Sequence, residues 1–312
     1  MGAPLAQFDE FVYYGFGLQV GVKNLLHNGF RLGLKKTAGK IFQPINSYSR
    51  FPEYWFIGRE IQDYLLRSKA ARPKILGVAS PKCFGLYLAS KFDADLDLTD
   101  IDAPSVQEAE ILWNAVRRRA HGTARFAVED ARALNYAGES FDVVYSMSVI
   151  EHVRGTTGDS DALREMLRVL KPLGLLLVTV PFGNTYVEQE RVAWEGARMV
   201  ADDARYFFQR IYTPQSAEMR MLQPVESTAT LLSSVSVSRK SGAMVSLYCK
   251  LGAELRGFAG FLNPWISLIA NRQHAGIVGI PGDYGPLYRK GDVYGELMLA
   301  WRKNVIGQAA AA

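Results

Sequence analysis

The chain has 312 residues, of which 48% are hydrophobic and 21% charged, and its mean hydropathy is −0.03. These values exclude a disordered protein, and they allow one large domain with additions or two small domains. The formal net charge is +5, from 36 Lys and Arg against 31 Asp and Glu. An excess this small can come from scattered surface lysines. It favours an anionic partner or a membrane surface but does not predict nucleic acid.

The cysteines and the N-terminus bear on the cellular location. Cys83 and Cys249 have neither the spacing of metal ligands nor that of a disulfide framework, so no metal site is predicted and a cytoplasmic location is expected. Asp9 and Glu10 lie in a stretch without a clear apolar core, so no signal peptide is expected. No run of about 18 apolar residues occurs, so no membrane-spanning helix is expected either.

Residues 1 to about 72 are predicted to form a helical cap ahead of the first core strand. Apolar residues recur at helical spacing in residues 8–12 and 19–26, and a helix is predicted over residues 57–67. The cap either covers the sheet or forms a lid over a ligand. Residues 35–42 place three lysines beside apolar side chains, which allows a third interpretation, a peripheral membrane contact.

From residue 74 onward, short apolar strands alternate with amphipathic segments of helical length. Strands are predicted at residues 74–79, 96–102, 126–130, 141–145 and 175–180, with a loop over residues 80–85. This alternation predicts βαβ units and a parallel sheet. In such sheets ligands bind at the carboxyl ends of the strands, where this sequence places several acids.

Beyond residue 183 the pattern is weaker. Helices are predicted at residues 187–199 and 214–222, and the last two strands at residues 233–238 and 296–302. About fifty extra residues separate these strands, so an insertion is predicted at about 242–292, which either serves function or covers the core. The expected organisation is a cap at residues 1–72 and one domain at residues 73–312.

The order of these motifs resembles the class I S-adenosylmethionine-dependent methyltransferases, in particular a small-molecule branch of the methyltransferase type 11 kind. The residues that carry the resemblance are Gly77 to Gly85, Asp100, Asp130, Ser146 to His152 and Val169 to Pro181. It implies an α/β, Rossmann-like sheet of seven mostly parallel strands with helices on both faces, plus the cap and the insertion before the last strand. It also implies methyl transfer from S-adenosylmethionine to an oxygen, nitrogen or carbon of a small, apolar or aromatic molecule.

The resemblance implies a set of cofactor-binding residues. The family's first loop carries glycines that let the backbone approach the methionine part of the cofactor. Here Ala79, Pro81 and Cys83 replace those glycines, and Gly77 stands where the family has an acid. Lys82 either pairs with the cofactor's carboxylate or is solvated. The full implied set is Gly77, Ala79, Ser80, Lys82, Gly85, Asp100, Ile101, Asp130, Ala131, Ser146, Met147 and Ser148.

Two of these acids have specific expected roles. Asp100 is expected to accept hydrogen bonds from the ribose hydroxyls, with Asp97 and Asp102 as rivals. The alternative for Asp100 is an N-cap of the following helix, a position that suits Asp102 better. Asp130 is expected to accept from the adenine amino group, or else to cap the following turn.

His152 is the candidate general base, with Glu151 orienting it or serving the structure. The alternatives are that the pair fixes its loop or contacts the cofactor, and that catalysis rests on proximity alone. Similar methyltransferases place aromatic residues ahead of the first strand over the cofactor. The residues implied for the substrate pocket on this basis are Tyr48, Arg50, Tyr54, Trp55 and Phe182.

Other functions were weighed against this interpretation. The altered glycine loop motivates a non-catalytic binding or scaffold protein on the same fold. A nicotinamide-dependent oxidoreductase also needs an acid after the second strand, but its glycine motif is missing. The three arginines at 117–119 complement a helix C-terminus, and no aromatic interleaving supports nucleic-acid binding. The sequence assigns no oligomeric state.

Overall fold

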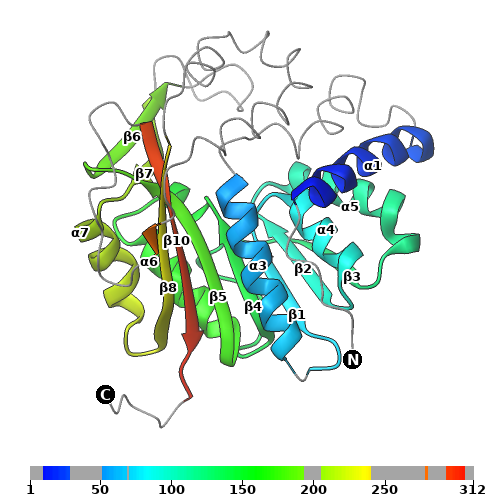
Figure 1. The fold of residues 1–312 in the computed structure, drawn as a ribbon. Coiled ribbons are helices and arrows are strands. Elements are labelled where there is room, and N and C mark those ends of the chain that lie inside the picture. The colour runs from blue at the N-terminus through cyan, green and yellow to red at the C-terminus, as the bar shows by residue number, and fades with distance from the viewer. Residues whose placement is uncertain are drawn as a thin grey trace.

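The structure is a computed structural model that describes residues 10–28, 51–68, 70–192, 205–239, 278–279 and 293–305. Its centre is an eight-stranded sheet in the order β3-β2-β1-β4-β5-β10-β8-β9, with helices on both faces (Figure 1). The strands of this sheet are β1 Lys74–Val78, β2 Asp95–Asp100, β3 Thr123–Val128, β4 Phe141–Met147, β5 Leu170–Phe182, β8 Ala229–Arg239, β9 Val278–Gly279 and β10 Val293–Lys303. A separate pair is formed by β6 Val187–Val192 and β7 Arg205–Ile211.

The helices are named in the same way. The α-helices are α1 Glu10–Asn28, α3 Phe51–Arg67, α4 Lys82–Lys91, α5 Ala103–Val116, α6 Gly158–Val169 and α7 Pro214–Ala217. Shorter turns of 3-10 or π type are η2 Arg117–Arg119, η3 Ile150–His152, η4 Glu218–Leu222 and η5 Gln223–Val225. Among the described residues, no helix is long and apolar enough to cross a membrane.

The predicted parallel sheet is confirmed. Strands β1 to β5 pair in parallel, whereas β10 runs antiparallel to both β5 and β8. The expected seven strands become eight because the two-residue β9 pairs with β8 at the edge. The predicted insertion lies outside the described residues apart from β9, and the division at residue 72 stays a prediction.

The sheet separates two hydrophobic layers because alternate strand residues point to opposite faces. Ile75 and Val143 face a cluster shared with α1, α3, α4 and α5. Their neighbours Leu76 and Val144 face a second cluster shared with α6 and α7. Helix α3, although it precedes the first strand, therefore packs as an integral layer of the core, and Figure 1 shows it crossing the sheet.

Two local predictions were wrong. The helix predicted over 187–199 is strand β6 at its start, because these residues alternate between half-buried and exposed and pair with β7; residues 193–199 lie outside the described part of the chain. The loop predicted over 80–85 ends early, since α4 begins at Lys82. Helix α6 begins after Thr157, whose side chain makes no capping hydrogen bond. Asp159, in the first turn of α6, is buried, and its carboxylate accepts from Arg220 and Tyr212.

Asp102 caps helix α5, as expected. Its Oδ2 accepts a hydrogen bond from the Ser105 backbone N–H at 3.0 Å, and Pro104 occupies the first turn, where its missing N–H costs nothing. This contact leaves Asp100 outside the capping role and removes one alternative for it. The turn from β2 into α5 is thus capped by Asp102 and not by Asp100.

Gly77 and Gly85 serve close packing, and their expected place at the cofactor stays a prediction. A Cβ on Gly77 would lie 2.6 Å from Tyr145 Oη, and one on Gly85 would lie 2.7 Å from Leu98 Cδ1. Tyr145 and Leu98 are buried, so neither can move aside easily. The two glycines let α4 lie close against β1, with the side chains of Tyr145 and Leu98 in the space that two methyl groups would fill.

We predict that Gly77→Ala lowers the free energy of unfolding by about 1–3 kcal/mol, because it overpacks a site that has no room for a methyl group. Gly138→Ala is the control, since its Cβ would meet only an ordinary contact at 3.5 Å. Urea denaturation of both variants measures the difference. Equal midpoints for the two variants would show that the Tyr145 ring yields and that the packing argument is wrong.

Candidate functional site

A cavity of about 440 Å³ opens at the carboxyl ends of β1, β2 and β4 and beside the turn after β3. It lies within the range of roughly 300–1,000 Å³ typical of small-molecule sites. Its walls come from segments far apart in the sequence. The lining residues are Ala79, Asp100, Ile101, Glu129, Asp130, Ala131, Arg132, Ser148, Val149, His152, Val153 and Arg154.

The cavity gathers much of the predicted site. The expected residues that line it are Ala79, Asp100, Ile101, Asp130, Ala131, Ser148 and His152. The expected residues that do not line it are Gly77, Ser80, Lys82, Gly85, Ser146, Met147 and Glu151. The first group comes from strand ends, whereas most of the second lies within a strand, in α4 or in the packed layer behind the cavity wall.

The serines and Met147 illustrate this second group. Ser80 is buried; its hydroxyl donates to the Val78 carbonyl at 3.1 Å and accepts from the Met147 backbone N–H at 3.0 Å. Ser80 therefore joins the ends of β1 and β4. The side chains of Ser146 and Met147 are also buried, so of the predicted run only Ser148 reaches the cavity.

Among the described residues, those expected at the substrate pocket lie away from this cavity. Tyr54 is buried in an aromatic cluster with Tyr13 and Phe84, and Trp55 packs against the same core with the Arg59 guanidinium 4.6 Å from its ring centre. Phe182 is buried on the opposite face of the sheet. Tyr48 and Arg50 lie outside the described residues. The described part of the predicted lid thus contributes core packing to this cavity, not a roof of aromatic side chains.

Two residues at the strand ends have left-handed backbone conformations. Ala79 follows β1 with φ 48°, and Ser148 follows β4 with φ 48°. Side chains other than glycine rarely adopt this region. Ala79 is held there by its N–H, which donates to the Thr99 carbonyl at 3.0 Å. These two turns bend the chain away from the sheet and leave the strand ends open to the cavity.

An ion pair fixes the acid at the end of β2. Lys82 Nζ lies 2.7 Å from Asp100 Oδ2 and donates to the Ser80 carbonyl at 3.0 Å, and the two charged side chains are only 10% and 18% exposed. The other oxygen, Asp100 Oδ1, accepts from the Asp102 backbone N–H at 3.1 Å. Lys82, for which the alternatives were pairing with a cofactor carboxylate or solvation, therefore holds Asp100 against the cavity wall.

Asp130 and Arg132 form the opposite wall. Arg132 donates to both carboxylate oxygens of Asp130, and its backbone N–H donates to Oδ1 at 2.9 Å. The hydrogen bonds from Arg132 lower the pKa of Asp130, so the carboxylate is ionised at neutral pH. The backbone contact matches the alternative of a turn cap. The rival acid Asp97 does not line the cavity, and burial raises its pKa.

His152 stands at the far side of the cavity in a defined orientation. Its Nδ1 lies 2.6 Å from the Phe208 carbonyl oxygen on β7, and its ring meets the Phe208 ring edge-on at 5.0 Å. A carbonyl only accepts, so Nδ1 carries the proton and Nε2 is the basic nitrogen of the neutral ring. The buried Glu151 has its Oε1 3.6 Å from that Nε2.

Glu53 is a site residue that the sequence did not reveal. It is fully buried in the first turn of α3, and its Oε1 accepts from the hydroxyls of Ser148 and Thr179. The Ser148 backbone N–H in turn donates to Thr179 Oγ1 at 3.1 Å. This network ties the helix before the first strand to the ends of β4 and β5, and it holds the one serine of its run that lines the cavity.

The remaining residues missed lie beside predicted ones. Glu129, Arg132, Val149, Val153 and Arg154 line the cavity because they share turns with residues that were expected there. Their position next to the predicted strand ends was the one sequence feature that could have placed them at the cavity. Glu53 lies 95 positions from Ser148 and 126 from Thr179, and no local pattern joins them.

Comparison with known proteins gives a family for this part of the chain. The model of the family described as Methyltransferase domain matches residues 83–178. The 2-methyl-6-phytyl-1,4-hydroquinone methyltransferase of Synechocystis is 45% identical over 56 residues, 18% of this chain and 17% of that protein. The ubiquinone/menaquinone biosynthesis C-methyltransferase UbiE of Azotobacter vinelandii is 46% identical over 57 residues, which are 18% of this chain and 21% of that protein. The match thus spans about a fifth of each relative's length.

Solved structures also resemble the chain. The crystal structure of an S-adenosylmethionine-dependent methyltransferase from Methanosarcina mazei has a TM-score of 0.49 and 17% identity, over 79% of this chain and 97% of that one. The crystal structure of a putative sarcosine dimethylglycine methyltransferase from Galdieria sulphuraria has a TM-score of 0.48 and 16% identity, over 81% of this chain and 84% of that one.

We predict that Glu53→Ala lowers the free energy of unfolding by about 1–3 kcal/mol, since it leaves the buried Thr179 hydroxyl and the half-buried Ser148 hydroxyl without their acceptor. Thermal unfolding measures the loss, and Asp63→Ala on the exposed side of the same helix is the matched control. Glu53→Gln keeps an acceptor oxygen and should recover part of the stability. A Glu53→Ala protein as stable as the control would contradict the proposed link.

Proposed function

We propose that this chain, which belongs to the class I S-adenosylmethionine-dependent methyltransferases, transfers a methyl group from that cofactor to a small molecule with an apolar or aromatic body. The observation that carries the proposal is the meeting of residues from four separate strand ends in one cavity. Seven of the twelve lining residues were expected at the site from the order of the motifs. A scaffold protein would not need this convergence, so the enzyme is the better supported function.

The residues at the cavity fit the cofactor. The Asp100 carboxylate keeps acceptor capacity beside its two contacts, because an ionised carboxylate has about four acceptor positions. Ile101 is exposed in the cavity and offers an apolar face for a base. Ala131 and the small side chain of Ala79 leave room for close approach of a ligand. Asp100 would hold the ribose, and the turn at 130–131 would lie at the base.

The cofactor supplies an electrophilic methyl group on a sulfonium. The chain has to orient the acceptor and accept the proton that the acceptor loses. Orientation is the larger requirement for such a transfer. His152 is placed for the second task, since its Nδ1 is committed to the Phe208 carbonyl and its Nε2 is the basic nitrogen. Glu151 is buried beside the ring, with its Oε1 3.6 Å from Nε2, and would orient the imidazole.

The acceptor class is inferred from the cavity and the relatives. Val149 and Val153 give apolar surface beside His152, and Arg154 adds a cation at the same wall. The two relatives are named for quinone-type substrates. Hydroquinones and other phenols, which carry an aromatic ring and an acidic hydroxyl, are therefore the first acceptors to screen with labelled S-adenosylmethionine. A cytoplasmic location stays a prediction.

We predict that Asp100→Ala weakens binding of S-adenosylhomocysteine at least about tenfold, because it removes one or two hydrogen bonds worth roughly 1.5–3 kcal/mol each. Isothermal titration calorimetry measures the affinity. Asp97→Asn, on the same strand but away from the cavity, should bind as the wild type does. The double variant Asp100→Ala, Lys82→Met separates loss of the acid from the unpaired lysine, and it should bind as weakly as Asp100→Ala.

An unchanged affinity in Asp100→Ala would refute the ribose assignment. Absence of binding by the wild type at millimolar ligand would refute the methyltransferase function as a whole. That second result would favour the scaffold protein, because the altered loop and the Lys82 contact would then be signs of a lost cofactor site.

His152→Gln is predicted to lower kcat while KM for the cofactor stays within about twofold, since the amide cannot take a proton but can keep the contact to the Phe208 carbonyl. The acidic limb of the pH profile of kcat should disappear in this variant. A kcat unchanged from the wild type would show that proximity alone drives the transfer and that His152 only fixes its loop.

A further inference from the structure

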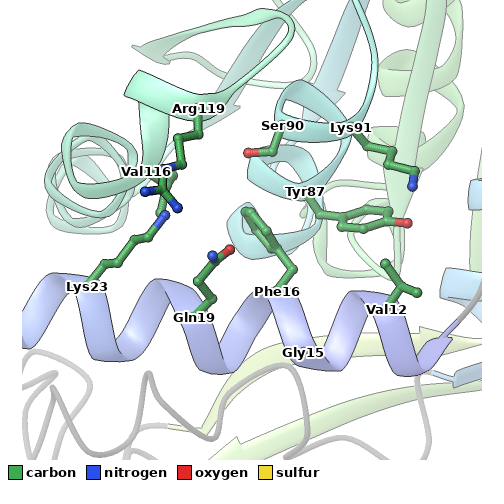
Figure 2. A pocket seen from close by; sticks show the side chains of 10 residues that line it. All are labelled: Val12, Gly15, Phe16, Gln19, Lys23, Tyr87, Ser90, Lys91, Val116 and Arg119. Carbon is green, nitrogen blue, oxygen red and sulfur yellow. The ribbon is translucent and has the colours of Figure 1, made fainter.

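A second cavity, of about 500 Å³, lies between α1, α4 and the end of α5 (Figure 2). It shares no residue with the candidate functional site. The lining residues are Val12, Gly15, Phe16, Gln19, Lys23, Tyr87, Ser90, Lys91, Val116 and Arg119. No motif of the sequence analysis pointed to it, and the proposed methyl transfer does not use it.

Three cations line this cavity, at its two ends. Lys23 from α1 and Arg119 from η2 reach toward each other at one end, as Figure 2 shows, and Lys91 from the last turn of α4 lies at the other end beside Val12. None of the three has an ion-pair or hydrogen-bond partner within the described parts of the chain, and no lining residue there is acidic. Like charges brought into one concavity without a counter-charge create a positive field that attracts an anion.

The rest of the cavity wall is mostly apolar. Val12, Phe16, Tyr87 and Val116 provide carbon surface, while Gln19 and Ser90 offer polar groups between that surface and the cations. A simple inorganic anion would use only one end of this space. The combination fits an anionic head group that continues into an apolar part.

The outer face of α1 supports the same conclusion. Leu18, Val22 and Leu26 recur every four residues, so they form one row, and they are 45%, 45% and 81% exposed. A helix on the surface of a soluble protein normally turns polar residues outward. Here the apolar row runs directly beside Gln19 and Lys23, which line the cavity. An exposed apolar row next to cations is typical of helices that lie in a membrane interface.

We propose that α1 lies on the surface of an anionic membrane, with the row Leu18, Val22 and Leu26 in the interface and the cavity holding the phosphate of a lipid head group. The net charge of +5 and the exposed Arg117 and Arg118 beside the cavity add to the attraction. A second copy of the chain is a poorer occupant, because two-fold pairing through this face would bring the two sets of cations together. This site is independent of the methyl-transfer proposal.

The test is sedimentation of the full chain with lipid vesicles. We expect binding to vesicles of phosphatidylcholine mixed with phosphatidylglycerol, weaker binding as salt is raised, and none to phosphatidylcholine alone. Lys23→Gln combined with Arg119→Gln should lower the partition coefficient at least tenfold, and so should Leu18→Gln combined with Leu26→Gln. The matched control is Leu66→Gln with Arg67→Gln, an exposed apolar and basic pair on α3 that should bind as the wild type does.

Circular dichroism and the affinity for S-adenosylhomocysteine show whether each variant is folded, since neither should change. Equal binding to neutral and anionic vesicles, or vesicle binding that all variants retain, would overturn the proposal. Binding of inorganic phosphate in calorimetry without vesicle binding would replace the lipid by a soluble anion. A concentration-dependent dimer that the Leu18 and Leu26 changes abolish would replace it by a second copy.

Discussion

The ion pair between Lys82 and Asp100 organises the edge of the sheet on which the candidate site is built. It joins the start of α4 to the end of β2, and it lies almost out of solvent. A buried carboxylate without its partner would be strongly unfavourable, so each group requires the other. In the loop where the resemblance led us to expect glycines, this chain has Pro81 and Lys82, and Lys82 fixes the position of the acid.

The geometry of the cavity then depends on how the neighbouring strands end. Ala79 and Ser148 both leave their strands through left-handed turns, and these turns expose the strand tips. Glu53, on the helix before the first strand, holds the turn at Ser148 by accepting a hydrogen bond from its hydroxyl. The N-terminal helix α3 is therefore a structural part of the site although it contributes no lining residue.

The two cavities of this molecule differ in the chemical character of their walls. The first is walled by fixed acids and their partners, with His152 oriented by a carbonyl from β7, and suits a polar cofactor beside an apolar acceptor. The second holds cations that have no acid beside them, within the described residues, and borders an exposed apolar row. One arrangement binds through convergent hydrogen bonds, and the other attracts by uncompensated charge.

The sequence by itself determined the alternation of strands and helices, the parallel sheet and the acids at the strand ends, because these follow from local periodicity and from the rule that ligands bind at carboxyl ends. It also located His152 and Ser148 next to β4. Only the tertiary structure decided that Gly77 and Gly85 serve close packing under Tyr145, that Lys82 binds Asp100, and that Tyr54 lies in the core. Contacts such as those of Glu53 join residues far apart in the chain, and local patterns carry no information on which distant side chains meet.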